Sequence, residues 1–240
     1  MTATPNLASQ AEEFFFSTWE VICRVLPVGD AEPTVVINED ADHMVAEFQI
    51  PLAFSGSALA QDENPESFSD MFWAVIRYDM CPDRTGRELA VRSSKFELRV
   101  HTAPGIRFEY ERDNTTAPRS HVHYSGMGGL LSTAIMRNFS GSRNRKRKGD
   151  VQDVHVPTGG ARFRPSLEDF LYFVIAECGF RAREGWSGYL LERREAWFDR
   201  QLGAAVRDHP RVARAALEKL GYRVLPPTGG DTPPGRYRGW

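Results

Sequence analysis

The sequence is poor in cysteine and in long apolar runs. Cys23, Cys81 and Cys178 are its only cysteines, and no two form a C-x-x-C pair. Such scattered residues are typical of buried thiols in a reducing cytoplasm, and they argue against a disulfide framework or a zinc–thiolate site. The longest apolar stretches, such as 72–76, are far too short to span a bilayer. The N-terminus has no signal-peptide pattern, so we expect a cytoplasmic protein without a membrane partner.

Basic residues are nearly absent from the first part of the chain. Residues 1–70 contain thirteen Asp and Glu and one basic residue, Arg24, whereas residues 71–240 contain nineteen acidic and twenty-nine basic residues. The net charge of −2 therefore combines an acidic N-terminal part with a basic remainder. This asymmetry allows a basic surface for nucleic acid. The simpler explanation is that the acidic part faces solvent or neutralises the basic part within the fold.

Periodicity in the apolar residues indicates both helices and strands. Helices are expected where apolar residues recur at spacings of three and four, with Ser9 and Ser166 as N-caps of the first two: 8–26, 166–177, 188–206 and 208–220. Strands are expected at 34–37, 43–52, 72–78, 88–101, 106–112, and in the histidine-containing segments 118–126 and 154–157. A turn at 103–105 is expected to separate two of these strands. Strands in immediate succession predict an antiparallel meander, not a doubly wound parallel sheet.

We therefore predict an α+β protein. A curved antiparallel sheet of six or seven strands is expected to pack with the first helix and the Ser166 helix, and a small helical appendage is expected to follow. The expected boundaries are 1–180 for the α+β domain, 181–225 for the appendage and 226–240 for a flexible tail. Within the first of these, residues 1–70 are acidic and residues 137–149 form a basic loop.

Three of the six histidines form the one cluster in the sequence with the makings of a site. His121 and His123 are two residues apart, so they share one face of a strand, and His155 on a neighbouring strand can converge with them. Imidazoles arranged in this way suit a metal site or a proton-transfer site. A third ligand or an orienting carboxylate is then needed, and Glu109 or Glu111 on the preceding strand is available.

Known histidine patterns do not fit this cluster. Cupin sheets follow the H-x-H pair with a Glu, whereas Tyr124-Ser125-Gly126 follows here. His155 precedes Val156-Pro157 and so lacks the His-x-Thr/Ser motif of two-histidine phosphoesterases, and a histidine-triad hydrolase needs a third alternate histidine. The sequence also has no phosphate-loop ending and no G-x-S-x-G nucleophile elbow.

Metal-free acid–base catalysis on RNA is an alternative role for the cluster. A histidine can take the proton of a 2′-hydroxyl while basic side chains hold the phosphate. The catalytic residues would be His121, His123 and His155, accompanied by Arg77, Tyr78, Arg119 and Tyr124. Phosphate contacts would come from the basic loop, through Arg143, Arg145, Lys146, Arg147 and Lys148. Histidines hydrogen-bonded within the sheet, and a solvated loop, explain the same residues without any catalysis.

The order of four short motifs resembles that of small uncharacterised prokaryotic proteins, some of them encoded in toxin–antitoxin-like pairs. The motifs are Arg77-Tyr78-Asp79, Glu109-Tyr110-Glu111, His121-Val122-His123 and the Ser/Pro-started helix at 164–170. The resemblance covers about residues 76–178. It implies a cytoplasmic role connected with a cognate protein partner or RNA, of the toxin-like or phage-defence type, and it implies no particular reaction.

Three hypotheses on function follow from the sequence. The first is a nucleic-acid-directed protein of toxin-like or defence-like type that contacts RNA or DNA phosphates. If this protein is an enzyme, the hypothesis makes it a hydrolase that cleaves RNA. The second is a non-enzymatic module that binds another protein. The third is a metal-dependent enzyme that acts on a small molecule. The sequence identifies no cofactor and assigns no metal ligand.

Overall fold

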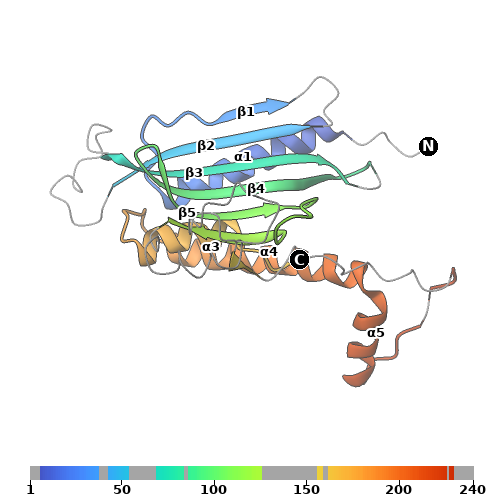
Figure 1. The fold of residues 1–240 in the computed structure, drawn as a ribbon. Coiled ribbons are helices and arrows are strands. Elements are labelled where there is room, and N and C mark those ends of the chain that lie inside the picture. The colour runs from blue at the N-terminus through green and yellow to red at the C-terminus, as the bar shows by residue number, and fades with distance from the viewer. Residues whose placement is uncertain are drawn as a thin grey trace, which may run out of the picture.

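The centre of the protein is a single antiparallel sheet. A computed structural model describes residues 6–37, 43–53, 69–83, 86–125, 156–158, 162–225 and 227–229. The strands lie in the sheet in the order in which they occur in the chain, as Figure 1 shows for β1 to β5. They are β1 (Thr34–Ile37), β2 (Met44–Leu52), β3 (Ser69–Pro82), β4 (Leu89–Val100), β5 (Ala103–Glu111), β6 (Ser120–Tyr124) and β7 (Val156–Pro157). The predicted antiparallel meander is therefore confirmed.

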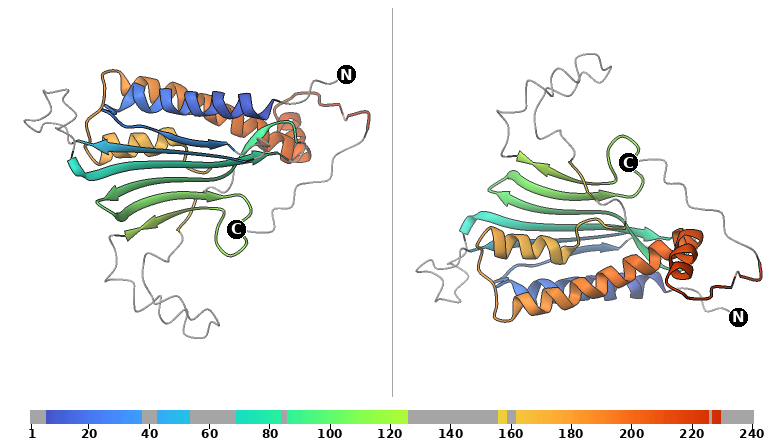
Figure 2. Two further views of the ribbon diagram at one scale, coloured as in Figure 1. Left: turned by 90° about the horizontal axis from the view of Figure 1, so that it is seen from above. Right: turned by 90° about the horizontal axis from the view of Figure 1, so that it is seen from below.

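Helices cover one face of this sheet. The covering helices are α1 (Leu7–Val25), α3 (Leu167–Tyr172), the π-helix η5 (Phe173–Glu177) and α4 (Trp186–Asp208), and α5 (Pro210–Lys219) follows α4. Figure 2 shows α1, α3 and α4 on the same side of the sheet in both views. The α+β class predicted from the sequence, with helices packed on the sheet and a helical segment at the C-terminal end, is confirmed.

The core lies between the apolar face of the sheet and these helices. Along β2, the alternate residues Met44, Ala46, Phe48 and Ile50 are buried, as a strand with one covered face requires. Phe48 stacks on Phe15 and Trp19 of α1. Phe96 of β4 and Phe108 of β5 both contact Phe170 of α3. The aromatic residues thus fix α1 over the first strands and α3 over the later ones.

The opposite face of the sheet carries charged residues. Arg77 of β3 pairs with Glu47 of β2 at 2.8 Å. On β4, Glu97 pairs with Lys95 at 2.6 Å and with Arg99 at 3.0 Å. Because side chains alternate along a strand, these residues point away from the apolar core. The sheet therefore has one apolar face for packing and one polar face that can carry a site.

Two local predictions are wrong. The N-cap of α1 is Asn6, whose side-chain oxygen accepts a hydrogen bond from the backbone N–H of Ser9 at 3.0 Å. Ser9 was the expected cap, but the helix begins two residues before it. Residues 103–105 belong to β5, and the chain turns instead at His101, where φ is +50°. Position 105 favours glycine, because the Cβ of any other residue would lie only 2.8 Å from the carbonyl oxygen of Leu98, which is too close.

The two C-terminal helices differ in how they pack. Leu190 of α4 lies in the same hydrophobic core as the sheet residues, and Arg162 ties the far end of α4 through an ion pair of 2.8 Å with Asp208. No residue of α5 is buried. Val212 within this helix is 68% exposed, and Leu220, which directly follows it, is 75% exposed. Within the part of the chain that the structure describes, no helix is long and apolar enough to cross a membrane.

Candidate functional site

The pairing of β5 with β6 brings a carboxylate next to the histidine pair. Glu109 lies directly opposite His121, and Arg107 lies opposite His123. Phe108 and Val122 alternate with these residues, and Phe108 packs on Phe170 of the helical layer. The carboxylate and both imidazoles therefore share the polar face of the sheet.

The two ring nitrogens of His121 have different partners. Its Nδ1 lies 2.6 Å from the carbonyl oxygen of Pro118. A carbonyl only accepts hydrogen bonds, so Nδ1 carries the proton and donates it. Its Nε2 lies 3.3 Å from Oε2 of Glu109. The Pro118 carbonyl thus fixes both the tautomer and the direction of the ring, and it turns Nε2 toward the carboxylate.

His123 approaches the same carboxylate oxygen. Its Nε2 lies 3.0 Å from Oε2 of Glu109. The rings of His121 and His123 meet edge to face, with centroids 4.9 Å apart and an interplanar angle of 77°. Two imidazole nitrogens from alternate positions on β6 therefore converge on one oxygen atom from β5.

The cluster is largely removed from solvent. His121 and His123 are 2% and 6% exposed, whereas the side chain of Glu109 keeps 17% of its surface exposed. Burial acts to raise the pKa of Glu109. The hydrogen bonds with His121 and His123 and the charge of Arg107 outweigh it, so the pKa lies well below its ordinary value. Glu109 is therefore a carboxylate at neutral pH.

The three side chains match the donor set of a transition-metal site. One ligand atom from each of Glu109, His121 and His123 lies within 4.8 Å of the others. Bonds of about 2.0 to 2.2 Å to a single ion at tetrahedral or octahedral angles place ligand atoms about 2.8 to 3.6 Å apart. The two measured nitrogen–oxygen distances, 3.0 and 3.3 Å, fall in this interval. A metal-bound histidine also commonly donates its other N–H to a backbone carbonyl, as His121 does.

A proton can occupy the same place as a metal ion. If Nε2 of His121 is protonated, the ring is an imidazolium that forms an ion pair with Glu109. If that nitrogen is not protonated, its lone pair faces a carboxylate oxygen, which is unfavourable unless a cation lies between them. The geometry therefore suits a cation at this point of the sheet, either a proton or a metal ion.

The remaining residues expected at the site lie elsewhere or outside the described residues. Arg77 is on the polar face, but β4 separates it from Glu109, and Glu47 pairs with it. Tyr124 follows His123 on β6, so it points to the opposite face, and it is 47% exposed. Tyr78 is buried between Phe14 and Phe96 on the helical side. His155 and the basic loop at 137–149, with Arg143, Arg145, Lys146, Arg147 and Lys148, lie outside the described residues.

The carboxylate is the residue that distinguishes this site from a bare histidine pair. The sequence offered Glu109 and Glu111 as equal candidates, because both alternate with the apolar residues of their strand. Only the β5–β6 register selects Glu109, by placing it opposite His121. A shift of one residue in that register would have moved both carboxylates to the other face.

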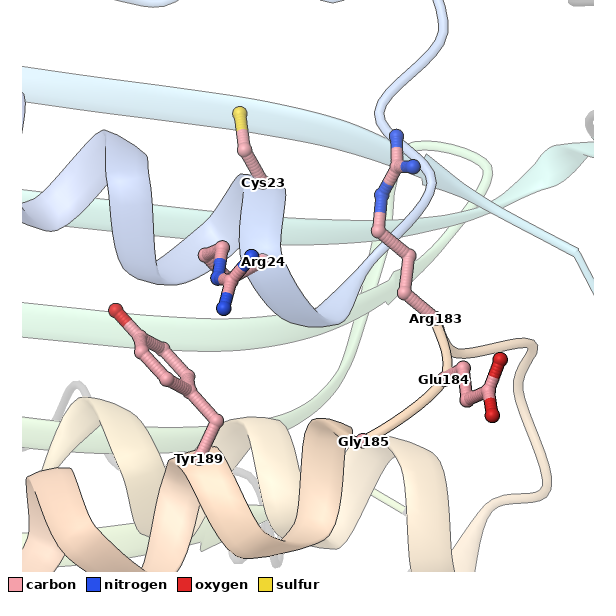
Figure 3. A pocket seen from close by; sticks show the side chains of 6 residues that line it. All are labelled: Cys23, Arg24, Arg183, Glu184, Gly185 and Tyr189. Atoms are coloured by element: carbon pink, nitrogen blue, oxygen red, sulfur yellow. The ribbon is translucent and has the colours of Figure 1, made fainter.

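A separate cavity lies on the helical side of the sheet. It has a volume of about 340 Å³ and is lined by Cys23, Arg24, Arg183, Glu184, Gly185 and Tyr189 (Figure 3). Arg24 lies over the ring of Tyr189 at 5.4 Å, and Nε of Arg183 donates to the carbonyl of Leu26. Burial raises the pKa of the Cys23 thiol, and the charge of Arg183 offsets this only in part. The surroundings of Cys23 therefore do not activate its thiol.

No protein-family model, no curated protein and no solved structure matches the chain. The resemblance to toxin–antitoxin-like proteins therefore stays a prediction.

Proposed function

We propose that the protein binds one divalent transition-metal ion through Glu109, His121 and His123 and that it is a metal-dependent hydrolase. The observation that carries this proposal is the convergence of two Nε2 atoms on one carboxylate oxygen. The Pro118 carbonyl adds to it by holding His121 in the tautomer that leaves Nε2 available to an ion. Imidazole nitrogen with carboxylate oxygen suits zinc, iron, nickel or copper better than magnesium or calcium.

Three protein ligands leave room in the coordination sphere for water and substrate. When bound, such an ion lowers the pKa of a coordinated water to about 7 and polarises an oxygen of the substrate. The protein holds the ligands ready for this role. Glu109 is charged because its pKa is lowered, and the hydrogen bond to Pro118 keeps the ring of His121 directed at the site.

The geometry supports a metal-free ribonuclease less well. Acid–base cleavage of RNA requires two groups that reach the substrate from different sides, one to take a proton and one to give it. Here Nε2 of both histidines faces the same carboxylate, and both rings are buried. The basic loop that favoured nucleic acid in the sequence lies outside the described residues, so it adds no geometric support.

The test is metal binding by purified protein and by single variants. Protein stripped with a chelator is dialysed against zinc, and bound metal is counted by mass spectrometry. We expect about one ion per chain for the wild type and a loss of most of it in His121→Ala, His123→Ala and Glu109→Gln. His43→Ala is the matched control, because His43 also faces a carboxylate on this sheet, Asp79 at 2.9 Å, but has no second histidine beside it among the described residues.

Thermal unfolding separates a metal site from a hydrogen-bonded structural cluster. A ligand at one hundred times its Kd adds about 2.7 kcal/mol to the free energy of unfolding, which for a chain of this size raises Tm by about 5 to 10 °C. We expect this rise with zinc for the wild type and not for the three ligand variants. Equal zinc content in all variants, or a wild-type Tm that zinc leaves unchanged, would contradict the proposal.

A further inference from the structure

Two arginines flank the carboxylate–histidine cluster on the same face of the sheet. Arg107 lies opposite His123 in the β5–β6 register. Arg119 immediately precedes β6, two residues before His121, and its carbonyl accepts the backbone N–H of Glu111, which extends the same antiparallel pairing. Alternation along the chain therefore places Arg119 and His121 on one face. The cluster lies between a cation at each end.

Both guanidinium groups have unused hydrogen-bonding capacity. Nε of Arg107 and Nε of Arg119 are buried and have no hydrogen-bond partner. Nη1 of Arg107 lies 3.6 Å from Oε1 of Glu109, which is too long for a hydrogen bond. A buried donor without an acceptor is unfavourable, so each of these groups is best satisfied by an acceptor that comes from outside.

The carboxylates nearby have contacts with other side chains. Glu97 lies opposite Arg107 and forms ion pairs with Lys95 and Arg99, although its buried Oε2 accepts no hydrogen bond. Glu111 lies opposite Arg119, and its Oε2 accepts a hydrogen bond from Asn114 at 2.8 Å. Among the residues that the structure describes, no carboxylate forms an ion pair with Arg119. With a divalent ion bound, the single charge of Glu109 leaves the site strongly positive.

We propose that the ligand of this centre is an oxyanion, a phosphoryl or carboxylate group that binds the metal ion between Arg107 and Arg119. This inference rests on the proposed metal centre. Guanidinium groups bind carboxylate and phosphate oxygens through paired N–H donors. The substrate of the hydrolase is accordingly a phosphate ester or a compound with a free carboxylate group, and not a neutral molecule.

The test is calorimetric titration of the zinc-loaded full-length protein with inorganic phosphate and, separately, with acetate. We expect phosphate or acetate to bind the wild type and to bind at least ten times more weakly to Arg107→Gln and to Arg119→Gln. Tighter binding of phosphate assigns a phosphoryl substrate, and tighter binding of acetate assigns a carboxylate. Arg77→Gln is the control, since Arg77 lies on the same face but pairs with Glu47, and it should bind as the wild type does.

Zinc content, measured on the same samples, distinguishes a failure of the inference from a failure of the proposed function. Normal zinc content with equal phosphate and acetate affinity in all four proteins, or with no binding of either anion, overturns the oxyanion inference alone. If the wild type takes up no zinc, the proposed function is overturned, and titration of the metal-free protein decides the inference. Anion binding that weakens in both arginine variants then upholds an oxyanion site, and absent binding overturns it.

Discussion

His121 uses both of its ring nitrogens. One is hydrogen-bonded to the backbone carbonyl of Pro118, and the other faces Glu109. A histidine that is buried to this extent needs a partner for each ring nitrogen, because neither can face solvent. The full use of both nitrogens at 2% exposure shows how closely the surroundings of this residue are specified.

The lowered pKa of Glu109 predicts that the stability of the fold depends on pH. Its pKa is below the ordinary value in the folded protein, so its carboxylate stabilises the fold above the unfolded value of about 4.3, and this contribution disappears as the pH falls further. Glu109→Gln should therefore cost about 1 to 3 kcal/mol at neutral pH and progressively less below pH 4. Urea unfolding of both proteins in chelator checks this, and a cost that does not change with pH would contradict it.

At the scale of the element, the N-caps of two helices can be tested by substitution, because the structure agrees with the sequence-based expectation for one cap and differs from it for the other. Ser166 caps α3 through a capping box with Asp169, as expected from the sequence, whereas Asn6 and not Ser9 caps α1. Ser166→Ala and Asn6→Ala should each reduce the free energy of unfolding by about 0.5 to 2 kcal/mol. Ser9→Ala should change it by less than about 0.5 kcal/mol. A loss in Ser9→Ala as large as that in Asn6→Ala would show that the cap is assigned to the wrong residue.

Alternation and helical spacing were sufficient to predict the elements but not the site. The alternate apolar residues of β2 and β5 identify both strands and their buried faces, because a strand with one covered face must alternate. The site depends on which residue of β5 lies opposite His121. That β5–β6 register depends on the connection 112–119, where Oδ1 of Asn114 accepts the backbone N–H of Ala117 and the carbonyl of Arg119 accepts the N–H of Glu111, and apolar periodicity does not specify such contacts.

On the scale of the whole molecule, the two faces of the sheet have different roles. Its apolar face joins α1, α3 and α4 into the core, and its polar face holds the carboxylate–histidine cluster between Arg107 and Arg119. Ligand variants on the polar face leave the core contacts untouched. We therefore expect the ligand variants to keep the fold, which the thermal unfolding of each variant checks.

The helix α5 should contribute little to stability. None of its residues is buried, so its removal exposes almost no core surface. A chain ending at His209 keeps the ion pair between Arg162 and Asp208 and should unfold within about 1 kcal/mol of the full chain. Denaturant unfolding with intrinsic tryptophan fluorescence measures the difference. A loss of several kcal/mol would mean that α5 packs against the rest of the protein.

The central claim is that Glu109, His121 and His123 together bind a metal ion. Anomalous diffraction at the zinc absorption edge from crystals of the zinc-loaded protein tests it most directly. The account predicts a single strong peak about 2.0 to 2.2 Å from Nε2 of both histidines and from a carboxylate oxygen of Glu109, with Nδ1 of His121 still bonded to Pro118. A zinc-loaded crystal with no peak at this cluster, or with zinc bound only at other residues, would contradict it.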